Sequence, residues 1–98
     1  MNFKVLLEPL AIEDIQQAII FYEERQEGLG RAFEIEINFY LILLETNPFF
    51  QLRYESVRCL PLKKFPFMIH YTLNEEYRIV IVRAIFHTSR DPLEWGTR

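Results

Sequence analysis

The chain has 98 residues, of which 50% are hydrophobic and 26% are charged, and this composition predicts one globular domain over residues 1–98. The formal net charge of −3 argues against a general nucleic-acid-binding protein, because such proteins usually carry a broad basic surface. The single cysteine, Cys59, cannot form an internal disulfide, and no spacing of Cys and His suits zinc, so we expect no metal and no cofactor. No segment resembles a signal peptide or is apolar enough to span a membrane, and we expect a cytoplasmic protein.

The N-terminal residues predict a strand and then a helix. Apolar side chains alternate from Phe3 to Leu7, which is a strand pattern, and Pro9 ends it. Residues 9–27 then place apolar side chains at helical spacing, so that they form one stripe. The stripe consists of Ile12, Ile15, Ile19 and Tyr22.

Residues 29–46 fit two patterns. Apolar side chains alternate from Phe33 to Leu41, as they would in a strand, but Phe33, Ile37 and Leu44 also share one helical stripe. The segment contains no turn signal and is longer than most strands. We therefore predict a second helix, which forms a hairpin with the first.

The second half of the chain predicts three strands. Asn47 and Pro48 end the second helix. The predicted strands cover residues 54–60, 65–72 and 77–86, and residues 89–98 are predicted to be irregular. The order β-α-α-β-β-β predicts an α+β domain, in which the helical hairpin packs on one face of a mostly antiparallel sheet.

The last predicted strand separates into two rows of side chains. One row is wholly apolar, and we expect it to face the helices: Val80, Val82, Ala84 and Phe86. The other row is expected to be partly open: Ile79, Ile81, Arg83, Ile85 and His87. This reading places Arg83 and His87 side by side on the same face.

The charge is unevenly distributed along the chain. Residues 1–47 carry three Lys or Arg and nine Asp or Glu, whereas residues 48–98 carry eight and five. The second half is therefore the expected place for an anion such as phosphate to bind.

A series of short motifs follows the predicted elements in order. They are residues 9–15; Gly28, Leu29 and Gly30 with Phe33; Asn47 and Pro48; Val57 and Arg58; residues 65–67 with Ile69 and Tyr71; and residues 87–92 with Trp95 and Arg98. In this order and spacing the chain resembles the ParE branch of the RelE/ParE toxin superfamily over essentially its whole length. The resemblance implies the RelE/ParE-like fold. It also implies a toxin of a type II toxin–antitoxin (plasmid stabilisation) module, neutralised by a cognate antitoxin that wraps around it.

The resemblance leaves two functions open. ParE-like members are associated with inhibition of DNA gyrase, whereas RelE-like members are metal-independent endonucleases that cleave mRNA on the ribosome. The acidic first half and the mildly basic second half favour a protein target, and we therefore expect gyrase inhibition without an enzymatic activity. An mRNA endonuclease is the alternative, and a toxin fold that has lost toxicity is a third, weaker option.

The alternative assigns roles to particular side chains. A ribonuclease needs an acid or base, for which His87 is the candidate, and cations that stabilise the phosphate, for which Arg83 and Arg58 are candidates. Further candidates for binding an anion or a partner are Lys63, Lys64, Arg90 and Tyr71.

Structural roles explain the same residues equally well. His87 can cap the strand end, Arg83 can pair with an acidic residue, and Tyr71 and His70 can serve the sheet, while Trp95 can anchor the tail. We further expect an apolar groove beside the helices to bind the antitoxin, or a homodimer to cover the same surface.

Overall fold

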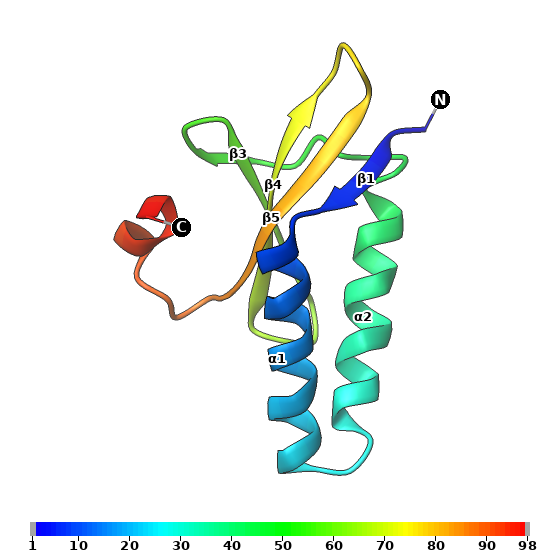
Figure 1. The fold of residues 1–98 in the computed structure, drawn as a ribbon, viewed down its shortest axis with the longest axis vertical. Coiled ribbons are helices and arrows are strands. Elements are labelled where there is room, and N and C mark those ends of the chain that lie inside the picture. The colour runs from blue at the N-terminus through cyan, green and yellow to red at the C-terminus, as the bar shows by residue number, and fades with distance from the viewer. Residues whose placement is uncertain (1, 98) are drawn as a thin grey trace.

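Two helices cover one face of a five-stranded sheet in the computed structural model, which describes residues 2–97 (Figure 1). In chain order the elements are β1 (Lys4–Leu7), α1 (Pro9–Arg25), α2 (Leu29–Leu43), β2 (Leu52–Tyr54), β3 (Val57–Pro61), β4 (Phe67–Asn74), β5 (Ile79–His87) and a short 3₁₀ helix, η1 (Pro92–Thr97). Both the α+β class and the helical hairpin are as predicted.

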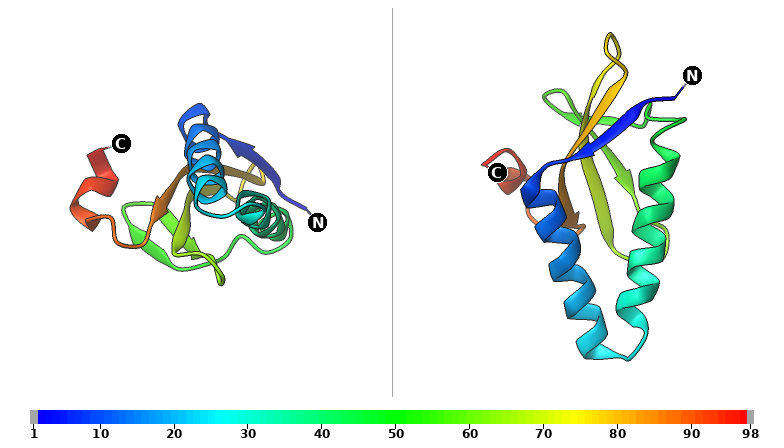
Figure 2. Two further views of the ribbon diagram at one scale, coloured as in Figure 1. Left: turned by 90° about the horizontal axis from the view of Figure 1, so that it is seen from below. Right: turned by 45° about the vertical axis from the view of Figure 1, so that its right-hand side comes forward.

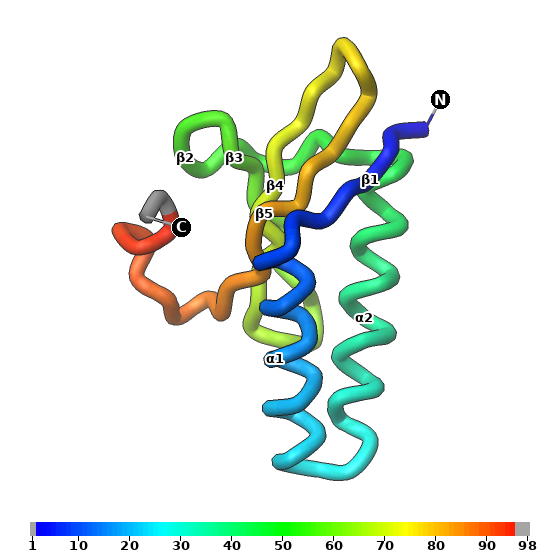
Figure 3. Tube along the Cα trace, viewed as in Figure 1, coloured from blue at the N-terminus to red at the C-terminus, as the bar shows by residue number. Residues whose placement is uncertain are grey.

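The sheet has the strand order β1-β5-β4-β3-β2. β1 pairs with β5 in parallel, and the other neighbouring strands are antiparallel. The chain therefore leaves β1, forms the helical hairpin, enters the sheet at its far edge and returns by successive hairpins to lie beside β1 (Figure 3).

The prediction of a second helix is confirmed, and two glycines let it lie close to the first. Gly28 precedes α2 with a φ of 86°, a left-handed conformation that glycine adopts at little cost. Gly30 touches α1, since a Cβ atom there would lie 2.6 Å from the carbonyl oxygen of Ile19. The carboxylate of Glu23 accepts the backbone N–H groups of both glycines, at 3.0 to 3.1 Å.

The stripe predicted for α1 is only partly correct. Ala11 and Ala18 are its buried residues, and Ile15, Ile19 and Tyr22 pack partly against the core, whereas Ile12 is 43% exposed. Small alanine side chains let the helix axis approach the sheet, so the buried stripe is rotated away from Ile12.

The segments before β4 and after β5 differ from the prediction. Residues 54–60 do not form a single strand, because the chain turns between β2 and β3 at Glu55, which has a φ of 47°. The C-terminal residues, predicted to be irregular, contain η1. Figure 2 shows η1 on the side of the sheet away from the helical hairpin.

A β-bulge at Arg83 overturns the predicted faces of β5. Tyr71 pairs with Val82, and the next residue back along β4, His70, pairs with Ala84, so Arg83 is an extra residue in the register. Such an insertion inverts the alternation of side chains in every residue that follows it.

The inverted alternation divides the apolar row that was expected to face the helices. Val80 and Val82 do pack in the core beneath the helices, but beyond the bulge it is Ile85 that joins them. Ala84 and Phe86 belong instead to a smaller cluster on the other face, which we call the second face. Its buried members are Cys59, Met68, Ala84, Phe86 and Trp95, with Tyr54 packed against them.

No helix among residues 2–97 is both long enough and apolar enough to span a membrane.

Candidate functional site

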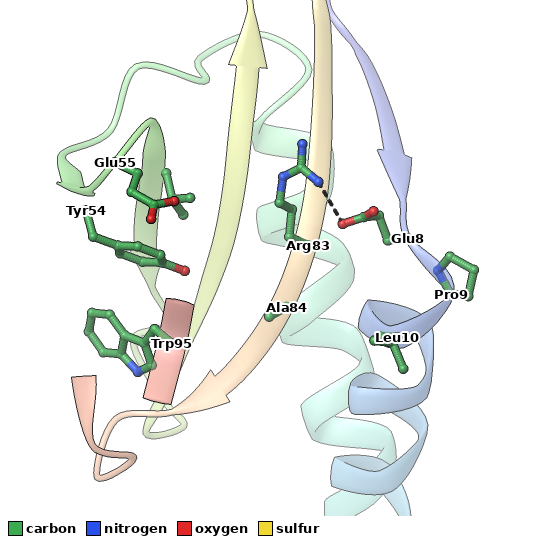
Figure 4. A pocket seen from close by; sticks show the side chains of 9 residues that line it. Glu8, Pro9, Leu10, Tyr54, Glu55, Arg83, Ala84 and Trp95 are labelled. Atoms are coloured by element: carbon green, nitrogen blue, oxygen red, sulfur yellow. Dashed lines mark hydrogen bonds and ion pairs between the residues drawn. The ribbon is translucent and has the colours of Figure 1, made fainter. Parts of the chain in front are cut away.

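Arg83 lies on the second face at the edge of a cavity. Its Nη1 is 3.1 Å from Oε1 of Glu8, and its Nε donates to the hydroxyl of Thr72 at 3.2 Å. The cavity has a volume of about 390 Å³ and separates this ion pair from an aromatic wall formed by Tyr54 and Trp95 (Figure 4). Arg83 thus pairs with an acidic residue, as its structural reading expects, and stays less than half exposed.

His87 lies on the other side of the sheet, beside α1. Its Nδ1 accepts the backbone N–H of Ser89 at 3.0 Å and lies 2.7 Å from the Ser89 hydroxyl, so the remaining ring nitrogen, Nε2, carries the proton when the ring is neutral. Its ring packs edge-on against Phe67, with centroids 5.2 Å apart. His87 and Arg90 line a shallow hollow of about 370 Å³ together with residues of α1.

Arg58 and Tyr71 fasten the loop that follows α2. Nη1 of Arg58 donates to the carbonyl of Phe50 at 2.8 Å. The hydroxyl of Tyr71 donates to the carbonyl of Pro48 at 2.7 Å and accepts the N–H of Phe50 at 3.2 Å. Tyr71 is fully buried, and this burial raises the pKa of its hydroxyl. A residue held in this way cannot stack on a nucleotide base, so Tyr71 serves the sheet.

The three residues of the nuclease hypothesis do not meet. Arg83 donates a hydrogen bond to the hydroxyl of Thr72. Thr72 is paired in the sheet with Val57 of β3, and Val57 lines the same cavity on the second face as Arg83. Arg58 follows Val57 and therefore points to the opposite face. His87 is on the face of Arg58 but at the other end of the sheet, paired with Phe67 at the start of β4. The expectation that Arg83 and His87 lie side by side is wrong, because the bulge separates their faces.

The two neighbouring lysines and Arg90 occupy different surroundings. Lys63 and Lys64 are exposed and line a groove of about 630 Å³ between α2 and the β3–β4 loop. The backbone N–H of Lys64 donates to Oε2 of the buried Glu36 at 2.6 Å, which holds the loop against α2. The guanidinium carbon of Arg90 lies 4.2 Å from the ring centroid of Phe86.

A buried polar cluster around His70 lies under η1. Nδ1 of His70 is 3.1 Å from the hydroxyl of Tyr54 and 3.4 Å from Sγ of Cys59. The ring of Trp95 packs edge-on against His70, with centroids 4.8 Å apart, and Trp95 is 8% exposed. His70 and Trp95 thus have the structural roles expected of them. Desolvation by burial raises the pKa of the Cys59 thiol to about 11, although Arg53 lowers it slightly.

The sequence analysis expected an apolar surface beside the helices but did not identify the residues that form it. The outward side of α2 carries three apolar side chains, Ile35, Phe39 and Ile42, which are 56%, 62% and 62% exposed. The signal was present in the ambiguity of residues 29–46. Apolar residues at alternate positions on a helix occupy two opposite sides of it, so the strand-like pattern marked a helix that is apolar on both sides.

The side chains of residues 2–97 do not form a recognisable metal site. Among these residues no group of three or more His, Cys, Asp or Glu side chains could hold a metal ion.

Comparison with known proteins identifies the fold. No family model and no curated protein matches the chain. Among solved structures, the chromosomal ParDE toxin–antitoxin system from P. aeruginosa matches with a TM-score of 0.72 and 15% identity, over 89% of this chain and 97% of that chain. The RelBE2 toxin–antitoxin complex from Mycobacterium tuberculosis gives 0.62 and 15%, over 89% and 99%. The archaeal RelE–RelB complex from Pyrococcus horikoshii OT3 gives 0.60 and 10%, over 93% and 100%. Because these identities are low, the likeness concerns architecture, and the chain has the RelE/ParE-like fold.

Proposed function

We propose that the protein is the toxin of a type II toxin–antitoxin module, that it inhibits DNA gyrase by binding, and that a cognate antitoxin neutralises it. The similar structures come from toxin–antitoxin complexes of the ParE and RelE kinds, and the ParDE match has the highest TM-score of the three. Fold alone does not determine function, so the proposal depends on the residues of the candidate site.

One observation carries the choice between binding and cleavage. Arg58, Arg83 and His87 lie in three separate places, and each already has a structural partner. Acid–base catalysis needs its groups within hydrogen-bonding reach of the same substrate atoms, about 2.6 to 3.2 Å. A dispersed set of cations is therefore better suited to contacts with a folded partner than to cleavage of a phosphodiester.

A specific observation keeps the endonuclease as the second candidate. His87 is exposed, its Nδ1 is fixed as an acceptor, and it shares a hollow with Arg90. A single acid–base group beside one cation is a smaller set than the three-residue centre of the sequence hypothesis, but it offers both a proton and a positive charge.

Two assays on the purified protein separate these candidates. The first measures supercoiling by gyrase, and the second maps cuts in a translated mRNA by primer extension, with and without ribosomes. Each is run with the wild type and with the double variant His87→Ala/Arg90→Ala, whose fold is checked by circular dichroism. We expect both proteins to inhibit supercoiling and neither to cut mRNA.

The opposite result would contradict the proposal. Ribosome-dependent cuts by the wild type, reduced about 10² to 10⁴-fold in the double variant, would make the protein an endonuclease with an acid–base group among these residues. Growth arrest on expression, relieved by a co-expressed antitoxin, tests the assignment as a toxin independently of the target.

A further inference from the structure

α2 is apolar on two opposite sides, and the molecule covers only one of them. Phe33 and Ile37 face the core and are fully buried. Ile35, Phe39 and Ile42 point the other way and form a continuous ridge, because residues spaced by four and three positions are neighbours on a helix. Neighbouring large apolar side chains that are exposed on one side of a helix form an apolar patch, and such a patch marks a contact surface for a second protein.

A hollow of matching character lies directly beside the ridge. The groove between α2 and the β3–β4 loop is mostly apolar, and Ile35 and Phe39 belong both to it and to the ridge. The rest of its apolar lining consists of Leu29, Ala32, Tyr40 and Phe65. A ridge and a hollow on the same surface are the two halves of a self-complementary contact.

The two flanks of the ridge differ in charge, because the groove side is basic and the other side carries an ion pair. Lys63 and Lys64 stand on the groove side. With 3.6 residues per turn, Glu34 falls on the other side of the ridge, at the same height along the helix as the groove. The side chain of Glu34 is 42% exposed, so its carboxylate is accessible to a second partner, which would share it with Arg31 at 2.9 Å.

We propose that two copies of this chain dimerise through α2, around a two-fold axis that runs nearly parallel to the helix. This rotation places the ridge of each copy in the hollow of the other. It also sets Lys63 of each copy opposite Glu34 of the other. A two-fold axis perpendicular to α2 would instead bring the two basic flanks, with Lys63 and Lys64 of each copy, together, which repulsion disfavours. In Figure 1, α2 forms one border of the molecule and η1 the opposite border, so the ridge is free to meet a second copy.

Sedimentation velocity tests the dimer on the purified full chain. The wild type is measured from about 1 µM to about 1 mM, which spans the affinities of weak interfaces. We expect a concentration-dependent dimer, whose dissociation constant rises at least about thirtyfold in Phe39→Asp, as for the loss of a buried aromatic anchor. The matched control is Leu93→Asp on η1, where the side chain is 86% exposed, and it should leave the dissociation constant unchanged.

Charge exchange tests the orientation of the two copies. Lys63→Glu and Glu34→Lys should each weaken the dimer about five- to tenfold, and the combined variant should restore it, because opposite charges again face each other. A wild type that stays monomeric up to about 1 mM would overturn the proposal and leave the ridge to another protein. Two weakened single variants without recovery in the combined variant would overturn the parallel arrangement.

Discussion

The two faces of the sheet carry cores of different composition. The face beneath α1 and α2 holds large apolar side chains, among them Phe33, Ile69 and Val82, in one continuous layer. The second face holds Cys59, Met68 and Trp95 around a buried histidine, and a 3₁₀ helix of six residues covers it. The first face can supply most of the folding free energy. The packing of the second face depends on the short C-terminal tail, which few contacts hold in place.

A single inserted residue in β5, Arg83, decides which of the later side chains of this strand face which core. If Arg83 instead occupied a regular position in the register, without a bulge, strict alternation along β5 would place Ala84 and Phe86 under the helices, and the second face would lose both. The bulge therefore supplies the second face with its apolar cluster, and it turns Arg83 toward Glu8 at the edge of the cavity.

The largest effect should come from removing an aromatic ring beneath the helices. Phe33 is fully buried and contacts the rings of Tyr22, Phe65 and Phe67, with centroids 5.2 to 5.6 Å apart. We expect Phe33→Ala to lower the free energy of unfolding in urea by about 3 to 5 kcal/mol, through lost burial and the cavity left behind. The matched control, Phe21→Ala, removes a ring that is 47% exposed and should cost about 1 kcal/mol or less. Similar losses for the two variants would show that the helix-covered core is not continuous.

A smaller effect is expected from the second face. Trp95→Ala removes the side chain that holds η1 against His70 and Tyr54. Because the tail can detach while the rest of the molecule stays folded, the loss should be about 2 to 3 kcal/mol, below that of Phe33→Ala. Hydrogen exchange should report faster exchange in residues 92–95 and unchanged exchange in α1. A loss equal to that of Phe33→Ala, with faster exchange throughout, would mean that the two faces unfold as one unit.

Local patterns gave the class and order of the elements correctly, because helices and sheets are fixed by periodicity over many residues. Residues 29–46 are the exception, since their periodicity fitted both a strand and a helix, and their length and the absence of a turn signal decided for a helix. What the patterns missed depends on single residues. The insertion at Arg83 is invisible in an alternating sequence, since a bulge is defined by the partner strand.

The candidate site was less predictable than the fold, for the same reason. The residue types needed for anion binding are present in the sequence, but their meeting in space depends on strand order and on the bulge. The prediction placed Arg83 and His87 together by counting every second residue, and one extra residue separated them. The structural reading of His70 and Tyr71 followed from their place in a predicted strand, whereas that of Trp95, which lies in η1, rested on its bulk.

The smallest predicted effect is a pH dependence of the free energy of unfolding, caused by the Cys59 thiol on the second face. Burial raises the pKa of the Cys59 thiol from an ordinary 9.0 to about 11. Below pH 9 the thiol is neutral in both the folded and the unfolded chain, so the group contributes nothing to pH dependence there. Between pH 9 and 11 the unfolded chain loses the proton and the folded chain keeps it, so the free energy of unfolding should fall by about 2 kcal/mol.

Cys59→Ala separates this contribution from that of the tyrosines. Burial also raises the pKa of the hydroxyls of Tyr22, Tyr54 and Tyr71, so their ionisation lowers stability in the same direction at still higher pH. Urea unfolding at pH 8, 9, 10 and 11 should therefore give a shallower decline for Cys59→Ala than for the wild type, spread over pH 9 to 11. Identical declines would mean that the thiol reaches solvent when η1 moves, because a thiol in water ionises near its ordinary pKa in both states. The second face would then be open in solution, and its cavity would be larger than the one that Trp95 and Tyr54 border in the folded chain.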